Sequence, residues 1–145
     1  MTNPIRILLV DDSPYFLEAA RAFLHLHEAQ AVVETATHAE ESIKKSSCME
    51  FDVILLDINL GDSNGLDLIP HFREHLPRAK IIVLSIMNEP AYRAAAMQAG
   101  ADAFLDKIAM NKTLMPAILQ QMETPAAQQI HVPSVNIEDD QEPEK

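Results

Sequence analysis

The sequence is poor in cysteine, in positive charge and in long hydrophobic runs. Cys48 is the single cysteine, so no internal disulfide can form, and we expect a reduced, cytoplasmic setting. Eleven Lys and Arg residues against 22 Asp and Glu residues give a net charge of −11, which opposes binding to nucleic acid or to an anionic membrane surface. No apolar run approaches the roughly 18 residues of a membrane span, and residues 1–6 lack the apolar segment of a signal peptide. These shortages favour a soluble, cytoplasmic protein that binds neither nucleic acid nor membrane.

What is present is enough for one hydrophobic core. With 145 residues, 48% of them hydrophobic, the chain predicts a single domain, which we place at residues 1–123. Residues 124–145 differ, because they hold three of the nine prolines, one lysine, five acids and no helical period. Such a composition cannot bury enough apolar surface to order itself, so we expect an acidic, disordered tail.

Strand-like and helix-like segments alternate along residues 1–123. Short apolar runs predict strands at residues 5–10, 31–36, 51–56, 80–84 and 103–105. Helical spacing of apolar residues predicts helices at residues 14–27, 38–46, 66–76, 90–99 and 112–122. Ser13 followed by Pro14 is typical of a helix start and Gly100 of a helix end, whereas Pro70 should kink its helix or delay its start. Strict alternation predicts an α/β fold with a flavodoxin-like, doubly wound parallel sheet of strand order 2-1-3-4-5.

The helix at residues 14–27 carries two apolar stripes. The first predicts the face that packs on the sheet: Phe16, Ala19, Ala20 and Phe23. The second is either a wider core face or a docking surface for a partner: Tyr15, Ala22 and Leu26. The spacing leaves both interpretations of the second stripe open.

Chemically active side chains follow four of the predicted strands. Asp11 and Asp12 follow the first strand, Asp57 the third, Ser85 the fourth and Lys107 the fifth. Because the carboxyl ends of parallel strands share one edge, these side chains should meet in one cleft. Three carboxylates that close repel one another, and a hard divalent ion such as Mg²⁺ would relieve the repulsion. Carboxylate, Mg²⁺, ammonium and hydroxyl together are what phosphoryl transfer to the carboxylate of Asp57 requires.

Four motifs agree with this chemistry in order and spacing: ILLVDDS, VILLDINLGDSNGLDLI, IIVLS and GADAFLDK. Over about residues 4–123 the chain resembles the receiver domain of two-component response regulators. The last motif and the Ala-rich helix before it are most similar to a subfamily that often carries a helix-turn-helix output domain. The resemblance implies a phosphoacceptor (Asp57), Mg²⁺ ligands (Asp11, Asp12, Asp57 and the main-chain carbonyl of Asn59), a switch pair (Ser85 and Phe104) and a phosphate-binding lysine (Lys107). Ile108 stands where many receivers have proline.

The resemblance also implies partners and a mode of action. A sensor histidine kinase or a phosphotransfer protein would phosphorylate Asp57, and the chain would act as a stand-alone receiver, switching a protein-binding surface toward a downstream protein target or relaying the phosphoryl group. When phosphorylation draws Ser85 inward, Phe104 is expected to rotate into the space behind it. Such a protein is not a turnover enzyme. Two alternatives remain at this point: a phosphorylation-independent adaptor, and a haloacid-dehalogenase-type phosphatase, whose DxD motif Asp57 and Asn59 resemble except for the second acid.

Overall fold

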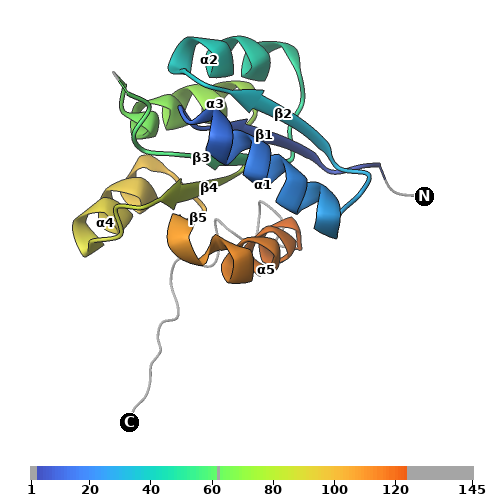
Figure 1. Ribbon diagram of the computed structural model, residues 1–145. Helices are drawn as coiled ribbons and strands as arrows, with labels where there is room; N and C mark the ends of the chain where they lie inside the picture. The colour runs from blue at the N-terminus through green and yellow to red at the C-terminus, as the bar shows by residue number, and fades with distance from the viewer. Residues whose placement is uncertain (1–2, 62, 124–145) are drawn as a thin grey trace.

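The sheet has the predicted order and direction. The computed structural model describes residues 3–61 and 63–123, and the predicted tail at residues 124–145 lies outside them. The described strands are β1 (Arg6–Val10), β2 (Val32–Ala36), β3 (Val53–Leu56), β4 (Lys80–Ser85) and β5 (Ala103–Asp106). They pair in parallel in the order β2-β1-β3-β4-β5, so the flavodoxin-like topology is confirmed (Figure 1).

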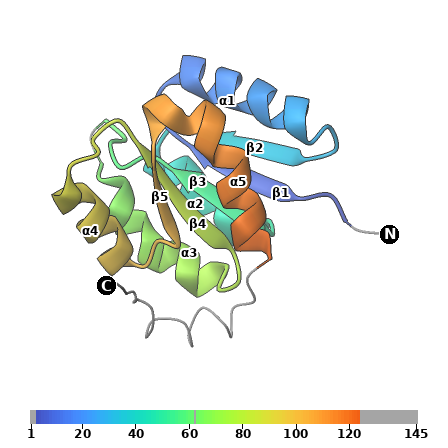
Figure 2. The same cartoon turned by 90° about the horizontal axis from the view of Figure 1, so that it is seen from below.

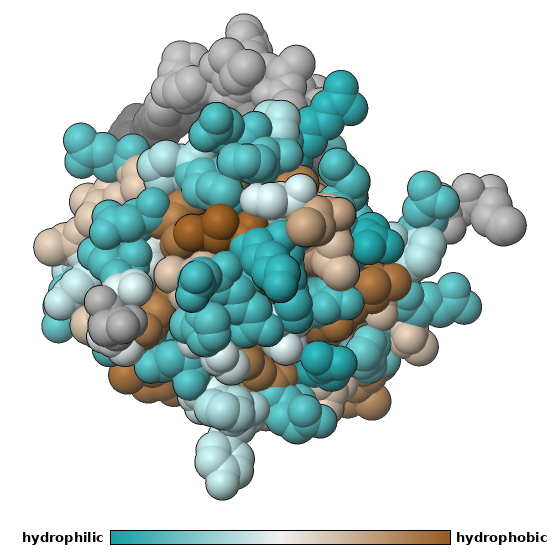
Figure 3. Space-filling view, turned by 90° about the horizontal axis from the view of Figure 1, so that it is seen from above, coloured by the Kyte–Doolittle hydropathy of each residue, from teal (hydrophilic) through white to brown (hydrophobic). Residues whose placement is uncertain are grey.

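Helices cover both faces of the sheet. The helices are α1 (Pro14–His27), α2 (Ala39–Cys48), α3 (Ile69–His75), α4 (Pro90–Ala99) and α5 (Met110–Met122), with 3₁₀ turns η1 (Gly65–Leu68) and η2 (Lys107–Ala109). One core layer lies under α1 and α5, and the other lies under α2, α3 and α4 (Figures 1 and 2). The face that carries α2 is largely hydrophilic, and its hydrophobic areas are small and separate (Figure 3). Among the described residues, no helix combines the length and apolar character needed to cross a bilayer.

The strand register places the predicted site residues at one edge. Val10, the last residue of β1, pairs with Leu56, the last residue of β3. Asp11 and Asp57 therefore leave neighbouring strands at the same level. Ser85 at the end of β4 pairs with Asp106, so Lys107 leaves β5 at the same edge. The topology thus brings together residues that are about 50 positions apart in the sequence.

The predicted helix caps at Ser13 and Gly100 are confirmed, whereas α5 begins at Met110 rather than Lys112 and α2 ends at Cys48 rather than Ser46. The hydroxyl oxygen of Ser13 accepts a hydrogen bond from the N–H of Phe16 at 3.2 Å, and Pro14 occupies the first turn of α1. Gly100 ends α4 with φ of 115°, a left-handed conformation that glycine adopts without steric cost. The predicted effect of Pro70 is also seen, because α3 begins only at Ile69, after the 3₁₀ turn η1.

The buried face of α1 differs from the predicted one. Leu17, Ala20 and Leu24 are its buried residues, whereas Phe16 and Phe23 are only partly buried and Ala19 is exposed. The second stripe is not part of the core, since Tyr15 is 89% and Leu26 is 81% exposed. The helix is apolar around most of its circumference, so spacing alone could not decide which stripe faces the sheet.

Candidate functional site

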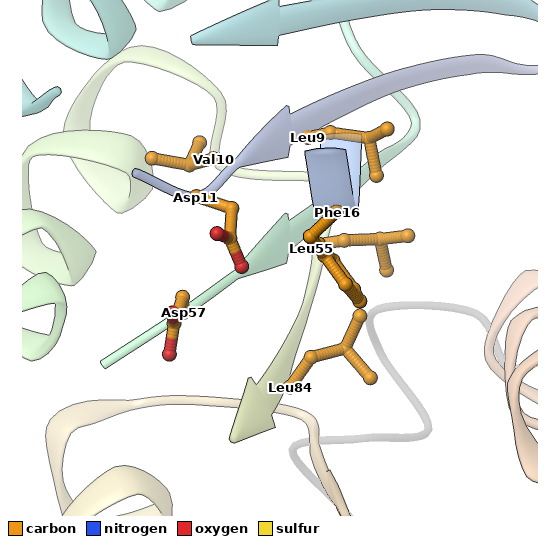
Figure 4. A pocket seen from close by; sticks show the side chains of 7 residues that line it. All are labelled: Leu9, Val10, Asp11, Phe16, Leu55, Asp57 and Leu84. Atoms are coloured by element: carbon orange, nitrogen blue, oxygen red, sulfur yellow. The ribbon is translucent and has the colours of Figure 1, made fainter. Parts of the chain in front are cut away.

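Three carboxylates form a cluster at the ends of β1 and β3. Asp11, Asp12 and Asp57 each offer an oxygen atom, and these oxygens lie within 4.8 Å of one another. Asp11 is 2% and Asp57 7% exposed, whereas Asp12 is exposed to solvent. Figure 4 shows Asp11 and Asp57 lining the same small cavity beneath α1. The cluster that the sequence predicted is therefore present in the fold.

Lys107 reaches into this cluster from the start of η2. Its Nζ lies 2.5 Å from Oδ2 of Asp11 and 3.1 Å from Oδ2 of Asp57. The same Nζ lies 4.2 Å from the centre of the Phe16 ring. The ammonium thus neutralises part of the negative charge of the two buried carboxylates. The meeting of Lys107 with Asp11 and Asp57 in one cleft was predicted from the sequence, and the contact with Phe16 was not.

Burial and neighbouring charges perturb the ionisation of this pair. Burial raises the pKa of Asp57, and the charge of Asp11 raises it further, while Lys107 and the N–H of Asn59 pull the pKa down without restoring it to its usual value. Burial alone would lower the pKa of Lys107, but the hydrogen bond to Asp11 and the charge of Asp57 outweigh burial and raise it. Lys107 is therefore a permanent cation at neutral pH.

The loop after β3 fixes the position of Asp57. The N–H of Asp57 donates to the carbonyl of Val10 at 2.9 Å, and the N–H of Asn59 donates to Oδ1 of Asp57 at 3.3 Å. Asn59 pairs with Asn64 in an isolated antiparallel bridge whose hydrogen bonds are made by the flanking residues. In such a pair the residue's own N–H and C=O point away from its partner. The main-chain carbonyl of Asn59 therefore points away from Asn64, and its role as a metal ligand stays a prediction.

Gly65 is a site-supporting residue that the sequence analysis missed. A Cβ atom at this position would lie 2.0 Å from the main-chain oxygen of Asp57 and 3.0 Å from its carbonyl carbon. No side chain can occupy that space unless the backbone of Asp57 moves. The N–H of Gly65 also donates to the carbonyl of Ile58, which closes the loop. The sequence signal for this role was a glycine in the loop, eight residues after the candidate phosphoacceptor Asp57.

Ser85 and Phe104 lie where the sequence placed them, on β4 and β5. Ser85 is fully buried, and its Oγ accepts a hydrogen bond from the N–H of Met87 at 2.9 Å. Phe104 is 4% exposed and packs in the core layer under α3 and α4. Its ring lies 4.9 Å from the guanidinium carbon of Arg93. The ring is buried in this structure, and its rotation on phosphorylation stays a prediction.

Ile108 has a defined role in the loop after β5. Its N–H donates to Oδ1 of Asp106 at 2.9 Å, which caps η2. Proline at this position could not make that bond, because it has no N–H. Ile108 therefore allows a hydrogen bond in the loop that carries Lys107, and a proline at this position would not allow it.

The donor set fits a hard divalent cation. Mg²⁺ binds oxygen ligands at about 2.1 Å in octahedral geometry, so its ligand oxygens lie about 3 to 4.2 Å apart. The three carboxylate oxygens within 4.8 Å of one another meet that requirement after sub-ångström adjustments. Oδ2 of the buried Asp11 has Lys107 Nζ as its ion-pair partner, and no other described residue donates a hydrogen bond to it. A carboxylate oxygen has two lone pairs, so one can still face a cation.

Comparison with known proteins agrees with the fold. The sequence pattern of the family described as "Response regulator receiver domain" matches residues 7–119. The nitrate/nitrite response regulator protein NarL of Escherichia coli K12 is 31% identical over 118 residues, which cover 81% of this chain and 55% of NarL. The chemotaxis protein CheY of Thermotoga maritima is 31% identical over 102 residues, covering 70% of this chain and 84% of CheY.

A solved structure extends the comparison. A response regulator protein from Burkholderia pseudomallei, described with a phosphorylated aspartic acid, a calcium ion and citrate, superposes with a TM-score of 0.71 at 27% identity; 88% of this chain and 73% of that chain are covered. The chain spans about half the length of NarL and of several other curated relatives. Since the family pattern covers more than three quarters of the sequence, the chain belongs to the response regulator receiver domain family.

Proposed function

We propose that the protein accepts a phosphoryl group on Asp57 from a histidine kinase or a phosphotransfer protein, with Mg²⁺, and that its phosphorylated form switches a protein-binding surface or relays the group. The observation that carries this proposal is the buried ion pair between Asp57 and Lys107, at 3.1 Å, inside a cluster of three carboxylates. A nucleophile and a cation placed this close are the two protein groups that phosphoryl transfer to a carboxylate needs.

The chemistry follows from the positions of the side chains. A carboxylate oxygen of Asp57 attacks the phosphorus atom, and the bond from phosphorus to the donor's imidazole nitrogen breaks, leaving the electron pair on the imidazole. Lys107 offers its ammonium to the phosphoryl oxygens, whose negative charge grows during transfer. The raised pKa of Asp57 makes its ionised form a more basic and more nucleophilic carboxylate than an exposed one.

Asp11, Asp12, Asp57 and the main-chain carbonyl of Asn59 would hold the metal ion. Bound there, Mg²⁺ supplies positive charge to the transferring oxygens. Asp12 is exposed, which suits an ion that keeps several water ligands. The phosphorylated aspartic acid described for the Burkholderia pseudomallei relative supports the same chemistry here.

The receiver family consists of signalling modules, and we propose that this chain is likewise not a turnover enzyme. CheY of Thermotoga maritima, of which the chain covers 84%, supports the proposal that such a domain can act without a long partner domain. The downstream target, on this proposal, is a protein. Family membership leaves the phosphatase alternative without support, whereas an adaptor that needs no phosphorylation is a second candidate that experiment can separate.

Intact-mass spectrometry after incubation with acetyl phosphate and Mg²⁺ tests the proposal. We expect one added phosphoryl group in the wild type and none in Asp57→Asn. Asp67→Asn is the matched control, because Asp67 is an exposed acid on η1 outside the cluster, and it should be labelled like the wild type. An unlabelled wild type would favour the adaptor. Repeated hydrolysis of an aryl phosphate would instead identify a phosphatase.

A further inference from the structure

The ammonium of Lys107 has three neighbours of different chemistry. Two are the carboxylates of Asp11 and Asp57, at 2.5 and 3.1 Å, and the third is the ring of Phe16, whose centre lies 4.2 Å from Nζ. A lysine ammonium has three N–H donors, and the two carboxylates can take two of them. The aromatic ring stands on the remaining side, where its negative face attracts a cation.

Two hydrogen bonds link the backbone at Phe16 to the acid cluster. The N–H of Ser13 donates to Oδ1 of Asp11 at 2.9 Å, and Oγ of Ser13 accepts from the N–H of Phe16 at 3.2 Å. These two hydrogen bonds connect the carboxylate of Asp11 to the first turn of α1. The turn therefore presents the Phe16 ring and the Asp11 carboxylate to Lys107 as one unit.

The surroundings of the ring favour a role beyond simple packing. Phe16 is only partly buried, and the buried core residues of α1 are Leu17, Ala20 and Leu24. Figure 4 shows Phe16 lining a small cavity together with Asp11, Asp57, Leu55 and Leu84. The ring thus lies between the apolar core and the charged cluster, and the side chain of Lys107, 14% exposed, lies against it.

We propose that Phe16 is a positioning residue: its ring face holds the ammonium of Lys107 beside Asp57 and keeps water from that side. This proposal rests on the proposed function of Asp57 and adds the residue that orients its cation. A ring face attracts the ammonium without offering a third carboxylate, so Lys107 keeps positive charge for the incoming phosphoryl group. The attraction is also weakly directional, so Nζ can follow the phosphoryl oxygens while remaining on the ring.

Three variants separate positioning from packing. Phe16→Leu keeps an apolar side chain but removes the ring, and it should slow phosphorylation of Asp57 by acetyl phosphate about five-fold. Phe16→Tyr keeps a ring face and should react at close to the wild-type rate. Phe23→Leu is the matched control, because Phe23 is a partly buried phenylalanine of the same helix whose ring contacts His27 at 4.4 Å. It should leave the rate unchanged.

A spectroscopic readout that needs no phosphorylation accompanies the rates. In the wild type the ring current of Phe16 should shift the NMR signals of the Lys107 ε-methylene upfield. The shift should disappear in Phe16→Leu and persist in Phe23→Leu. Replacing Phe16 with trifluorophenylalanine keeps the shape of the ring but weakens its negative face, so the rate should fall between those of the wild type and Phe16→Leu.

The outcomes distinguish this proposal from the proposed function. If the wild type takes no phosphoryl group, the function assigned to Asp57 has failed. If the wild type is labelled and Phe16→Leu is labelled equally fast, or if Phe23→Leu is slowed as much, the positioning role alone is overturned. A trifluorophenylalanine variant that reacts like the wild type would show that ring shape, and not its charge distribution, matters, and would also overturn it.

Discussion

The carboxylate of Asp57 is subject to influences that act in opposite directions. Burial and the neighbouring charge of Asp11 disfavour its ionised form, while Lys107 and the N–H of Asn59 favour it, and the pKa remains raised. The ionised side chain therefore does not contribute to stability as a typical paired carboxylate would. This is expected of a residue kept for its reactivity, since perturbed groups gather at functional sites.

The raised pKa of Asp57 predicts how stability depends on pH. The folded protein holds this proton more tightly than the unfolded chain does, so the contribution of Asp57 to stability is complete below about pH 3.8 and is lost as the pH rises through the raised value. Asp57→Asn has no such loss. In metal-free buffer it should have a higher free energy of unfolding than the wild type at pH 7, with a difference that shrinks toward pH 4.

Urea unfolding at several pH values measures this difference. A constant difference between pH 4 and pH 7 would contradict the assignment of the raised pKa to Asp57. Loss of the ion pair with Lys107 in the variant fades toward low pH, as Asp57 becomes protonated in the wild type, and the raised pKa of Asp57 already includes this contribution.

Asp12 is the member of the cluster that can be altered with the least disturbance, because it is exposed. Asp12→Asn removes one of three repelling charges, so the metal-free protein should become slightly more stable. It also removes a metal ligand. At 100 times its Kd, an ion that binds only the folded state adds about 2.7 kcal/mol, and a ten-fold weaker affinity reduces this by about 1.3 kcal/mol.

Thermal unfolding with EDTA and with Mg²⁺ checks this prediction, with Asp67→Asn as the control for loss of an acid elsewhere on the surface. The Mg²⁺-induced rise in Tm should be smaller in Asp12→Asn than in the wild type and unchanged in Asp67→Asn. Equal rises in all three proteins would exclude Asp12 as a ligand.

Among the secondary-structure elements, α4 is the one most open to rearrangement. Its only buried residue is Ala96. A guanidinium nitrogen of Arg93 donates to the carbonyl of Phe104 at 3.3 Å, and Asn88 in the loop before α4 donates to Oδ2 of Asp106 at 2.8 Å. Elements with little buried surface are those that open most easily. These hydrogen bonds therefore link α4, and the loop between β4 and α4, to β5.

The connection between the end of β4, the loop before α4 and β5 predicts the effect of Ser85→Ala. The hydroxyl of Ser85 can meet a phosphoryl oxygen only by leaving its hydrogen bond to the N–H of Met87, which would move the loop before α4. Ser85→Ala should still be phosphorylated on Asp57, but the signals of α4, β5 and α5 should change much less on phosphorylation. Asp57→Asn should lose both responses.

NMR spectra with and without beryllofluoride, a mimic of the phosphoryl group, test the prediction. In the wild type we expect changes at Phe104 and along α4, because a rotation of the buried Phe104 ring would alter its packing in the core. Changes confined to the strand-end loops would instead indicate another signalling surface, for which the exposed stripe of Tyr15, Ala22 and Leu26 on α1 is the candidate. A ligand shifts such an equilibrium only by its different affinity for the two states.

At the scale of the whole molecule, the carboxyl ends and the amino ends of the parallel strands have different roles. The carboxyl edge gathers repelling carboxylates around one lysine. Near the opposite edge, Oδ2 of Asp102 binds Arg73 at 2.6 Å and the N–H of Ile81 at 2.8 Å, and Arg73 donates to the carbonyl of Ala79 at 2.6 Å. This network ties α3 to β4 and to the start of β5. Stabilising ion pairs and hydrogen bonds thus lie away from the site, whereas the carboxylates at the site repel one another.

The residues after Glu123 should contribute little to this stability. The composition of residues 124–145 opposes stable packing. Trimming the chain after Glu123 should therefore change Tm by less than about 2 °C. A loss of 1 kcal/mol would lower Tm by roughly 3–6 °C in a domain of this size.

Calorimetry of the full chain and the trimmed chain measures the change. A fall of several degrees would show that the tail packs against the body. The place to look would be the groove of about 460 Å³ between the start of β1 and α5, which Ile5, Met115 and Met122 line. Lys112 is an exposed residue of α5, and replacing it with a neutral residue should leave the Tm of the full chain unchanged if apolar contacts hold the tail in this groove.

The sequence alone determined the order of the elements, their caps and the residue that ends each strand. These are local properties: a buried strand is a short apolar run, and a cap such as Ser13 or Gly100 acts within a few residues. Because parallel strands share one edge, the meeting of Asp11, Asp57 and Lys107 also followed from the alternation of strands and helices. The family resemblance then supplied their expected roles.

The tertiary structure alone decided which groups touch. That Leu17 and Leu24, and not Ala19, face the sheet depends on the rotation of a helix with more than one apolar stripe, which packing sets and spacing does not. The approach of Gly65 to the backbone of Asp57 and the place of the Phe16 ring over Lys107 are relations in space between distant positions of the chain. Local sequence patterns carry no distances between such positions, so only the folded chain could show them.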